Sequence, residues 1–465
     1  MKQSQNRRVL IFGIHRTVDW WQYLGQNMGW GESVVVTDLR GEGEICIVDD
    51  FYAELGPLRA KESPRSPHLT DAEVEDVIAR CRALRWLDSR LARAMAHAVA
   101  IAFDRVLERT RPRLVLSLPI DRYVTDVLER LARKRGIRYF ELTASPFPDM
   151  SMLLERGALV RLPDPPAPEV LEARMQELSS PAFVPSYVRG RTKYNHVKFV
   201  RTMGYFQARG LAFRAIGWAK RDPLNLHYLD AQPFLGHKCR WKDIRVLDMC
   251  DYQWRDKLSA FPIEKRVFLG MQLFPEASID YWLQNRALID HENLIVQAVS
   301  VFSKAGYLVL VKDHPLQFGF RHTDVLERLL AMPNVVFVPY DVSGNELLSL
   351  VKVNFTCTGT LGLQAALAGL TSIVTESYYA NDRDFVLFRE PSELSGLPER
   401  IEKFPPDGSL EARRRNIIEP LLRGSFEADF FTFRNFDRKR SEEGPRALAG
   451  ALGHRLDLLA EGGNL

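Results

Sequence analysis

The sequence predicts an α/β protein with two Rossmann-like domains and a mainly helical insertion between them. Three observations support this fold class. The chain has 465 residues, which is too long for one ordinary hydrophobic core. Its hydrophobic content of 46% and charged content of 26% are typical of a globular protein. Short apolar runs also alternate with helical patterns in two separate blocks, as in doubly wound parallel sheets.

The first block predicts an N-terminal Rossmann-like domain over residues 1–150. Its strands and helices alternate, and one long helical period is rich in Ala, Arg and Leu. The predicted strands are residues 8–13, 33–38, 113–117 and 137–141, and the predicted helices are residues 71–110 and 123–134.

A helical insertion is predicted over residues 151–262, because the β–α alternation stops there and prolines interrupt the chain. Within it, nine Lys and Arg residues and no Asp or Glu occur from Arg189 to Arg221, interleaved with aromatic residues. Such a surface suits anionic lipid headgroups or a negatively charged polysaccharide. The alternative is a solvated helical face that packs through its aromatic residues. Nucleic acid is not expected as a partner, because no RNA- or DNA-binding module surrounds this segment.

The second block predicts a C-terminal Rossmann-like domain over residues 263–408, followed by helices and a tail over residues 409–465. The predicted strands are residues 266–269, 306–311, 335–338, 353–356 and 371–375, and the predicted helices are residues 289–304, 324–330, 345–351 and 359–368.

The strand over residues 306–311 leads into Lys312-Asp313-His314-Pro315. Proline cannot continue a central strand, so the chain leaves the sheet at its carboxyl edge, where ligands bind in open α/β sheets. His314 can donate to a phosphate oxygen and stabilise a departing nucleotide. The simpler alternative is a turn histidine bonded to backbone groups. Lys312 is interpreted as a strand-end surface charge, with a phosphate contact as its alternative.

A second phosphate-binding feature is predicted where the strand over residues 353–356 leads into Thr358-Gly359-Thr360 and a helix. Small hydroxyl residues at a helix start expose backbone N–H groups and the positive end of the helix dipole. Thr358 and Thr360 can cap the helix, bind phosphate, or do both. Together with His314 they predict a site for a nucleotide-sugar diphosphate or monophosphate.

Missing motifs argue against several other functions. No Gly-x-Gly-x-x-Gly follows the first strand and no P-loop sequence occurs, which disfavours a dehydrogenase and a P-loop NTPase. The five cysteines are scattered without zinc spacing, as in a reducing compartment, and no metal site is expected. Asp49-Asp50 is interpreted as a strand-end turn. Without a signal peptide or a spanning apolar run, we expect a cytoplasmic protein, peripheral at the inner face of the cytoplasmic membrane.

Two Rossmann-like halves facing a cleft match the architecture of GT-B glycosyltransferases, in which the second half holds the donor nucleotide. Residues 265–376 also resemble the bacterial capsule polysaccharide biosynthesis family, which includes Kdo (3-deoxy-manno-octulosonate) transferases. Three segments carry this resemblance: residues 271–278, 312–315 and 358–366. The chain has Thr-Gly-Thr where the family usually has paired serines, a change that keeps the hydroxyl groups.

The resemblance implies a glycosyltransferase that moves a sugar from a nucleotide-activated donor, CMP-Kdo or a similar molecule, to a bacterial surface polysaccharide or glycolipid. It places the donor phosphate on His314 and the Ser/Thr turn. Glu276 would hold a ribose hydroxyl or lie in solvent as a loop charge. The expected donor-binding residues are Gln272, Glu276, Lys312, His314, Thr358, Gly359 and Thr360.

In GT-B enzymes the loop after the first strand faces the acceptor. If the reaction inverts the anomeric centre, a carboxylate or histidine must take the acceptor's proton. Asp19 and His15 are the catalytic candidates beside His314, with Asp121 and Glu141 behind them. In the alternative interpretation Asp19 caps a helix and the two tryptophans after it are core residues. A retaining enzyme would need no conventional base.

Two other functions stay open at the level of the sequence. One is a polyol-phosphate transferase similar to teichoic acid enzymes, which would also release CMP or CDP. The other is a non-catalytic nucleotide- or glycan-binding partner of capsule assembly. No cofactor is expected beyond the nucleotide-sugar substrate, and because GT-B enzymes generally need no metal, we expect full activity in EDTA.

Overall fold

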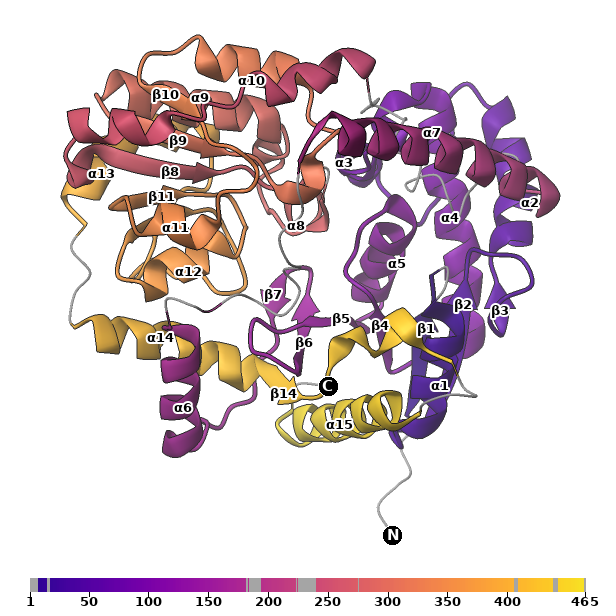
Figure 1. Ribbon diagram of the computed structural model, residues 1–465. Helices are drawn as coiled ribbons and strands as arrows, with labels where there is room; N and C mark the ends of the chain where they lie inside the picture. The colour runs from indigo at the N-terminus through magenta and orange to yellow at the C-terminus, as the bar shows by residue number, and fades with distance from the viewer. Residues whose placement is uncertain are drawn as a thin grey trace. The chain divides into compact units, whose positions relative to one another are not determined.

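The computed structural model describes residues 7–14, 17–180, 183, 194–222, 224, 240–274, 276–404, 409–437 and 442–463. The chain divides into two compact units (Figure 1). The first unit contains Met1–Pro165, Leu211–Gly236 and Leu422–Leu465, and the second contains Pro166–Gly210 and His237–Leu421. The predicted insertion over residues 151–262 is therefore shared between the two units and is not a separate body.

The first unit is built on a sheet with the strand order β14-β6-β5-β4-β1-β2-β3, and β7 pairs with β6. The strands from β3 to β5 are parallel, whereas β6, β7 and β14 pair antiparallel. The elements of this unit are β1 (Arg8–Phe12), α1 (Val18–Asn27), β2 (Glu32–Thr37), β3 (Ile45–Cys46), α2 (Val48–Ala60), α3 (Asp71–Arg80), α4 (Ser89–Thr110), β4 (Leu114–Ser117), α5 (Tyr123–Lys134), β5 (Arg138–Ala144), β6 (Met150–Glu155), β7 (Ala158–Leu159), β14 (Ser425–Glu427) and α15 (Glu443–Glu461).

Two predictions for this unit were wrong in detail. The predicted helical insertion begins at residue 151, but β6 (Met150–Glu155) and β7 (Ala158–Leu159) extend the first sheet to residue 159. The nearby prolines lie in the turn between β5 and β6, where Asp149 adopts a φ of 53°. The long helical period over residues 71–110 is two helices, α3 and α4, because the chain breaks between them and Asp88 caps α4 by accepting the N–H of Leu91.

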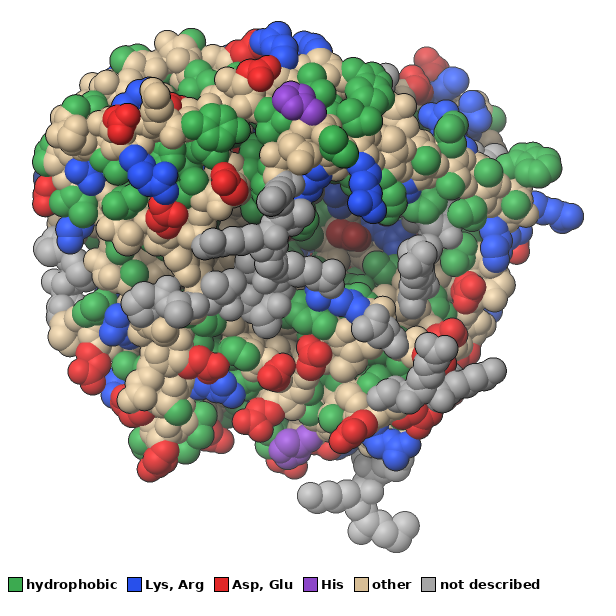
Figure 2. Space-filling view, viewed as in Figure 1, with side chains coloured by type: hydrophobic (Ala, Val, Ile, Leu, Met, Phe, Trp, Pro, Cys, Tyr) green, Lys and Arg blue, Asp and Glu red, His purple; other side chains and the backbone are tan. Residues whose placement is uncertain are grey.

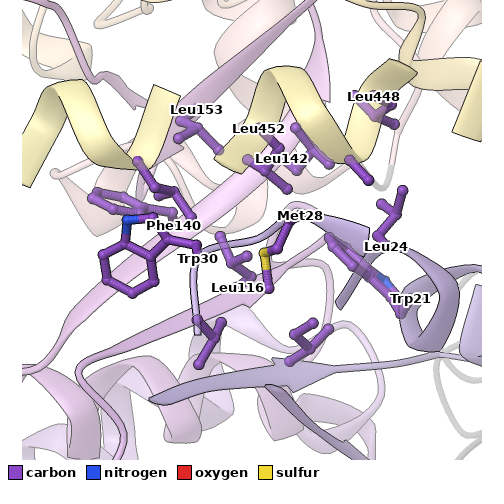
Figure 3. Close-up of a cluster of buried hydrophobic side chains, with 14 of the residues drawn as sticks. Trp21, Leu24, Met28, Trp30, Leu116, Phe140, Leu142, Leu153, Leu448 and Leu452 are labelled. Carbon is purple, nitrogen blue, oxygen red and sulfur yellow. The ribbon is translucent and has the colours of Figure 1, made fainter. Parts of the chain in front are cut away.

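Helices α1 and α15 cover one face of the first sheet, with a dry core between them and the strands (Figure 3). Trp21 and Leu24 of α1, Phe140 of β5 and Leu452 of α15 point into this core and are completely buried. Gly453 allows the close approach of α15, because a Cβ at that position would lie 1.7 Å from the carbonyl oxygen of Met28. The C-terminal helix is thus an integral part of the first unit.

The second unit contains an entirely parallel sheet with the strand order β10-β9-β8-β11-β12-β13. Numbered within the unit, this order is 3-2-1-4-5-6, that of the doubly wound Rossmann fold. Helices α7 (His196–Ala219) and α14 (Leu410–Gly424) contain residues of both units. The other elements of the second unit are α6 (Pro168–Leu178), β8 (Arg266–Gly270), α8 (Ala277–Asp280), α9 (His291–Lys304), β9 (Leu308–Lys312), α10 (Thr323–Leu330), β10 (Val335–Phe337), α11 (Gly344–Leu348), β11 (Val353–Phe355), α12 (Leu361–Leu367), β12 (Thr371–Val374), β13 (Val386–Leu387) and α13 (Leu397–Glu402).

The fold class predicted from the sequence is confirmed, since each unit has a sheet in which parallel strands predominate and helices pack on it. In the part of the chain that the structure describes, no helix is both long enough and apolar enough to cross a lipid bilayer.

Candidate functional site

The second unit has a topological switch point between β8 and β11, where the strand order reverses. In sheets of this kind ligands bind beyond the carboxyl ends of the strands at such a point. The segments that leave the sheet at this edge begin at Met271 after β8, at Asp313 after β9 and at Thr356 after β11. They contain all of the donor-binding residues predicted from the sequence except Lys312, which is the last residue of β9.

A buried ion pair lies at the centre of this edge. The Asp313 Oδ1 atom accepts hydrogen bonds from the Arg321 guanidinium, at 3.1 Å from Nε and 2.9 Å from Nη2. The Tyr340 hydroxyl donates to Asp313 Oδ2 at 2.6 Å, and the His314 backbone N–H donates to Oδ1 at 2.9 Å. Both charged side chains are fully buried. Burial by itself lowers the pKa of Arg321, but the facing Asp313 carboxylate outweighs it and the pKa is raised, so the guanidinium keeps its charge.

The same arginine connects the loop that follows β9 to the loop that follows β8. Arg321 Nη2 also donates to the backbone carbonyl of Gln272 at 2.7 Å. The Gln317 side-chain amide forms two bonds with the backbone of Phe274, each 2.9 Å long. These contacts fix the path of the loop after β8 relative to the loop that carries His314.

The β8 exit is joined to the β11 exit by a side-chain pair. Gln272 Nε2 donates to the Thr358 hydroxyl at 2.8 Å, and Gln272 Oε1 accepts the Thr358 backbone N–H at 2.7 Å. The Thr358 hydroxyl donates in turn to Ser278 at 2.9 Å, and Ser278 donates to the half-buried Glu276 at 3.2 Å. Because the only hydroxyl hydrogen of Thr358 is already used, it must leave Ser278 before it can donate to a phosphate. Phosphate binding by Thr358 therefore stays a prediction.

His314 is half-buried at the β9 exit, and its Nδ1 atom accepts the Leu316 backbone N–H at 3.2 Å. An accepting Nδ1 carries no proton, so in the neutral ring the proton sits on Nε2. Burial lowers the pKa of this imidazole, with a smaller opposing effect from Asp313. At neutral pH the side chain is thus a neutral Nε2–H donor. His314 can therefore be bonded to the backbone of the turn through Nδ1 and still donate to a ligand through Nε2.

Lys312 is buried at the end of β9, so its interpretation as a strand-end surface charge was wrong. Its ammonium group donates to the Tyr340 carbonyl oxygen at 3.0 Å. Burial lowers the pKa of Lys312 to about 8, with Asp313 opposing the shift. The charge is therefore retained at pH 7, and a phosphate contact by this residue stays a prediction.

Gly359 and Thr360 form the turn that enters α12. The helix begins at Leu361, two residues later than predicted, and has seven residues. Thr360 is its N-cap residue but makes no side-chain capping bond. The Tyr379 hydroxyl donates to the Gly359 carbonyl oxygen at 2.7 Å and holds the turn. A Cβ at Gly359 would lie 2.8 Å from the Thr356 hydroxyl oxygen, so this turn has no room for a larger residue.

The acceptor-side candidates lie in the first unit. Asp19 is exposed in the first turn of α1, and the N-cap residue of this helix is Thr17, so the alternative interpretation of Asp19 as the cap was wrong. Trp20 and Trp21 are fully buried, as that interpretation expected. His15 lies outside the described residues. Glu141 is buried, and its two oxygens accept backbone N–H groups of Ile120 and Gly157 at 2.9 and 3.1 Å. It holds two loops together, which is a structural role.

The remaining acidic candidates are engaged in ion pairs. Asp121 is half-buried, with a carboxylate oxygen 3.8 Å from Arg122 Nε. Asp49 and Asp50 belong to the first turn of α2, not to a strand-end turn, and they pair with Arg40 at 2.6 Å and Arg105 at 3.5 Å. Among the described residues no group of three His, Cys, Asp or Glu side chains is arranged to hold a metal ion.

Sequence reasoning gave no role to Arg321, Tyr340, Gln317 or Ser278. The available signal was Asp313, a carboxylate directly after a strand whose residues before Lys312 are all apolar, so that a buried partner could be expected. Its partners come from eight residues later in the same loop and from the next strand exit. No local pattern connects positions so distant in the chain.

A model described as the Abhydrolase family matches residues 242–441. This segment is 200 of the 465 residues, less than half of the chain. It contains no Gly-x-Ser-x-Gly sequence, the turn that carries the nucleophile in hydrolases of that fold. No curated protein matches the chain.

Among solved structures the chain is similar to two KpsC enzymes of Thermosulfurimonas dismutans. The β-Kdo 2,4-transferase is 13% identical with a TM-score of 0.37, covering 69% of this chain and 83% of that one. The β-Kdo 2,7-transferase is 13% identical with a TM-score of 0.32, covering 75% and 89%. A UDP-GlcNAc 2-epimerase from Neisseria meningitidis, bound to UDP-GlcNAc, is 10% identical with a TM-score of 0.28, covering 98% and 100%.

Kdo transferases, the class that the sequence motifs resemble, are thus among the structural matches. Identities and TM-scores are low, so the class of the protein rests on its own sheets and side chains. They define a two-unit α/β protein whose second unit is a doubly wound domain with a polar network at its switch point.

Proposed function

We propose that this chain is a glycosyltransferase that takes a sugar from a nucleotide-activated donor, with a CMP-linked sugar such as CMP-Kdo favoured, and adds it to a bacterial surface polysaccharide or glycolipid. The observation that carries the proposal is His314, a neutral Nε2–H donor at the carboxyl edge of a doubly wound sheet. A hydrogen bond from Arg321 to the Gln272 carbonyl fixes the loop beside His314. The imidazole Nε2–H group is therefore positioned before a ligand binds.

Transfer breaks the bond between the anomeric carbon and the phosphate oxygen, and negative charge develops on the departing nucleotide. A preorganised donor aimed at this oxygen stabilises the transition state more than the ground state. We assign that role to His314, and we infer that backbone N–H groups of the Gly359–Thr360 turn would bind the same phosphate. In an inverting reaction Asp19 or His15 would accept the acceptor's proton, and no metal is required.

The polyol-phosphate transferase remains the alternative enzyme, because it would use the same kind of leaving group. The non-catalytic alternative is a nucleotide- or glycan-binding partner of capsule assembly. The identity of the donor substrate distinguishes the polyol-phosphate transferase from the proposed enzyme. A turnover assay distinguishes the non-catalytic partner, which binds but does not catalyse transfer.

A thermal-shift panel of the purified chain with CMP, CDP, UDP and GDP is the first experiment. A nucleotide that binds only the folded state raises its stability by about 2.7 kcal/mol at a hundred times its Kd. The best nucleotide is then tested on His314→Ala, with His454→Ala, an exposed histidine of α15, as the matched control. Turnover of the corresponding sugar donor is measured with and without EDTA.

Stabilisation by CMP that is weakened in His314→Ala and kept in His454→Ala supports the proposal. Stabilisation by UDP or GDP keeps the transferase but excludes a CMP-linked donor. Activity that is lost in EDTA and restored by Mg²⁺ or Mn²⁺ would show that a metal takes part. No thermal shift with any of the four nucleotides would favour the non-catalytic partner.

A further inference from the structure

Helix α7 carries a surface that the proposed transfer reaction does not use. Its C-terminal half, from Leu211 onward, belongs to the first unit. On the inner side of this half Phe213 is buried against Leu39, in the turn that follows β2, and Ile216 packs beside them. Because these residues pack against the first unit, the opposite side of the helix is the one that faces solvent.

The outer side is apolar. Leu211 and Trp218, seven residues apart and on one helical face, have 66% and 84% of their surface exposed. Ala215 lies between them on the same face and is exposed as well. The N-terminal half of the helix, counted with the second unit, repeats the feature with Val197 and Val200, which are 76% and 47% exposed.

Positively charged residues lie along this helix, and its own sequence contains no negatively charged ones. Arg201, Arg214, Lys220 and Arg221 are exposed, and the sequence from Arg189 to Arg221 contains no Asp or Glu. Figure 2 shows hydrophobic and basic side chains next to one another over α7. The excess of Lys and Arg along this segment favours a positive local potential.

We propose that α7 docks on an anionic membrane surface through a docking face made of Leu211, Ala215 and Trp218, with Arg214 and Arg221 at its borders. A helix with exposed Trp and Leu on one side and basic residues beside them suits the boundary between headgroups and acyl chains. Anionic lipids complement its charge. A second copy of the chain does not, because two such faces would bring like charges together.

The docking face would place the enzyme where a glycolipid acceptor is found, but the inference does not depend on the transfer reaction. It is tested by co-sedimentation of the full chain with vesicles of phosphatidylcholine alone and of phosphatidylcholine mixed with phosphatidylglycerol. We expect binding to the anionic vesicles only, and weaker binding as salt increases, since screening shortens the reach of the charges.

Variants at the docking face separate its apolar and basic parts. Trp218→Ser should weaken vesicle binding by about tenfold or more, because a large apolar side chain no longer enters the interface. Its control is Trp86→Ser, a tryptophan that is 62% exposed elsewhere in the first unit and should bind as the wild type does. Arg214→Gln and Arg221→Gln should each weaken binding by about fivefold, and the exposed Lys61→Gln should not.

Equal binding to neutral and anionic vesicles, or wild-type binding by Trp218→Ser, would overturn the proposal. So would a concentration-dependent dimer in sedimentation velocity that Trp218→Ser abolishes, because it would assign the face to a second copy. The vesicle assay requires neither sugar donor nor turnover, so its failure leaves the glycosyltransferase proposal untouched, and the reverse also holds.

Discussion

Arg321 and Asp313 form a completely buried ion pair at the carboxyl edge of the second sheet, with two guanidinium nitrogens on one carboxylate oxygen. The pair also connects two strand exits, because the same guanidinium binds the Gln272 carbonyl. The position of the loop that carries His314 therefore depends on a contact that is completely buried.

Arg321→Met tests this pair. The substitution leaves the Asp313 carboxylate buried without its charge partner, which typically lowers the free energy of unfolding by about 3–5 kcal/mol. Urea-induced unfolding followed by circular dichroism measures the loss. Arg133→Met is the control, because Arg133 is mostly exposed and pairs with Glu129 at 3.5 Å, a contact expected to contribute at most about 1 kcal/mol. Equal losses in the two variants would contradict the assigned role of the buried pair.

His314→Ala should keep its fold and lose about 10²–10³-fold in kcat, the usual effect of removing one donor to a developing negative charge. His314→Gln should recover part of the rate, because its amide can still donate. Burial lowers the pKa of His314, so the neutral ring, whose Nδ1 atom accepts the Leu316 N–H, persists below pH 6.5. The rate should fall only in more acidic solution, where a protonated Nδ1 breaks this bond and releases the ring from its position. Turnover of the wild type and of both variants, measured against pH, checks this, and an unchanged kcat in a folded His314→Ala would remove the residue from the mechanism.

Much of the fold could be predicted from the sequence because the strands of both sheets are short, apolar and bounded by turn residues. The strand ending at Lys312 is an example, since β9 spans Leu308–Lys312 with every residue buried. The break between α3 and α4 was missed because the residues around it continue a helical pattern, and the Asp88 cap is visible only with its partner. The place of β6 was missed because prolines near a strand resemble those of a linker.

The residues of the candidate site could be predicted from their positions after strands, but the hydrogen bonds between them could not. Residues such as Gln272 and Thr358 were found because they follow strands, yet their mutual hydrogen bonds join positions 86 residues apart. The sequence also did not indicate that the Lys312 side chain is buried, so this residue was interpreted as exposed. Contacts of this kind depend on how strands are ordered in the sheet, which sequence periodicity does not encode.

His291 should make the stability of the second unit depend on pH. It is buried at the start of α9, and burial, assisted by the charge of Arg321, lowers its pKa from 6.5 to about 3. The unfolded chain binds a proton near pH 6.5 whereas the folded chain does so only near pH 3. The stabilisation is therefore complete above pH 6.5 and is lost as the pH falls toward 3.

The expected slope from this group is about 1.4 kcal/mol per pH unit within that window. His291→Gln should flatten the decline of unfolding free energy between pH 6.5 and 4.5 by this amount, and His454→Gln, in an exposed position, should leave it unchanged. Urea unfolding at pH 7, 6 and 5 provides the comparison. A His291→Gln protein with the wild-type slope would assign the acid sensitivity to other groups.

Gly362 links packing to the predicted phosphate turn. A Cβ at this position would lie 2.5 Å from Val374 Cγ1 and 2.6 Å from the Tyr379 hydroxyl oxygen, which itself holds the Gly359 carbonyl. Gly362→Ala should therefore destabilise the chain by about 1–3 kcal/mol through overpacking.

The displaced Tyr379 hydroxyl should also release the turn at Gly359, so that nucleotide binding weakens together with stability. Gly396→Ala is the matched control, because a Cβ there meets no atom within 4 Å. Thermal unfolding with and without the best nucleotide separates the two effects. If Gly362→Ala loses stability but keeps the full ligand-induced shift, the turn at Gly359 does not contact the nucleotide, and the phosphate must be held by His314 and its neighbours at the β9 exit.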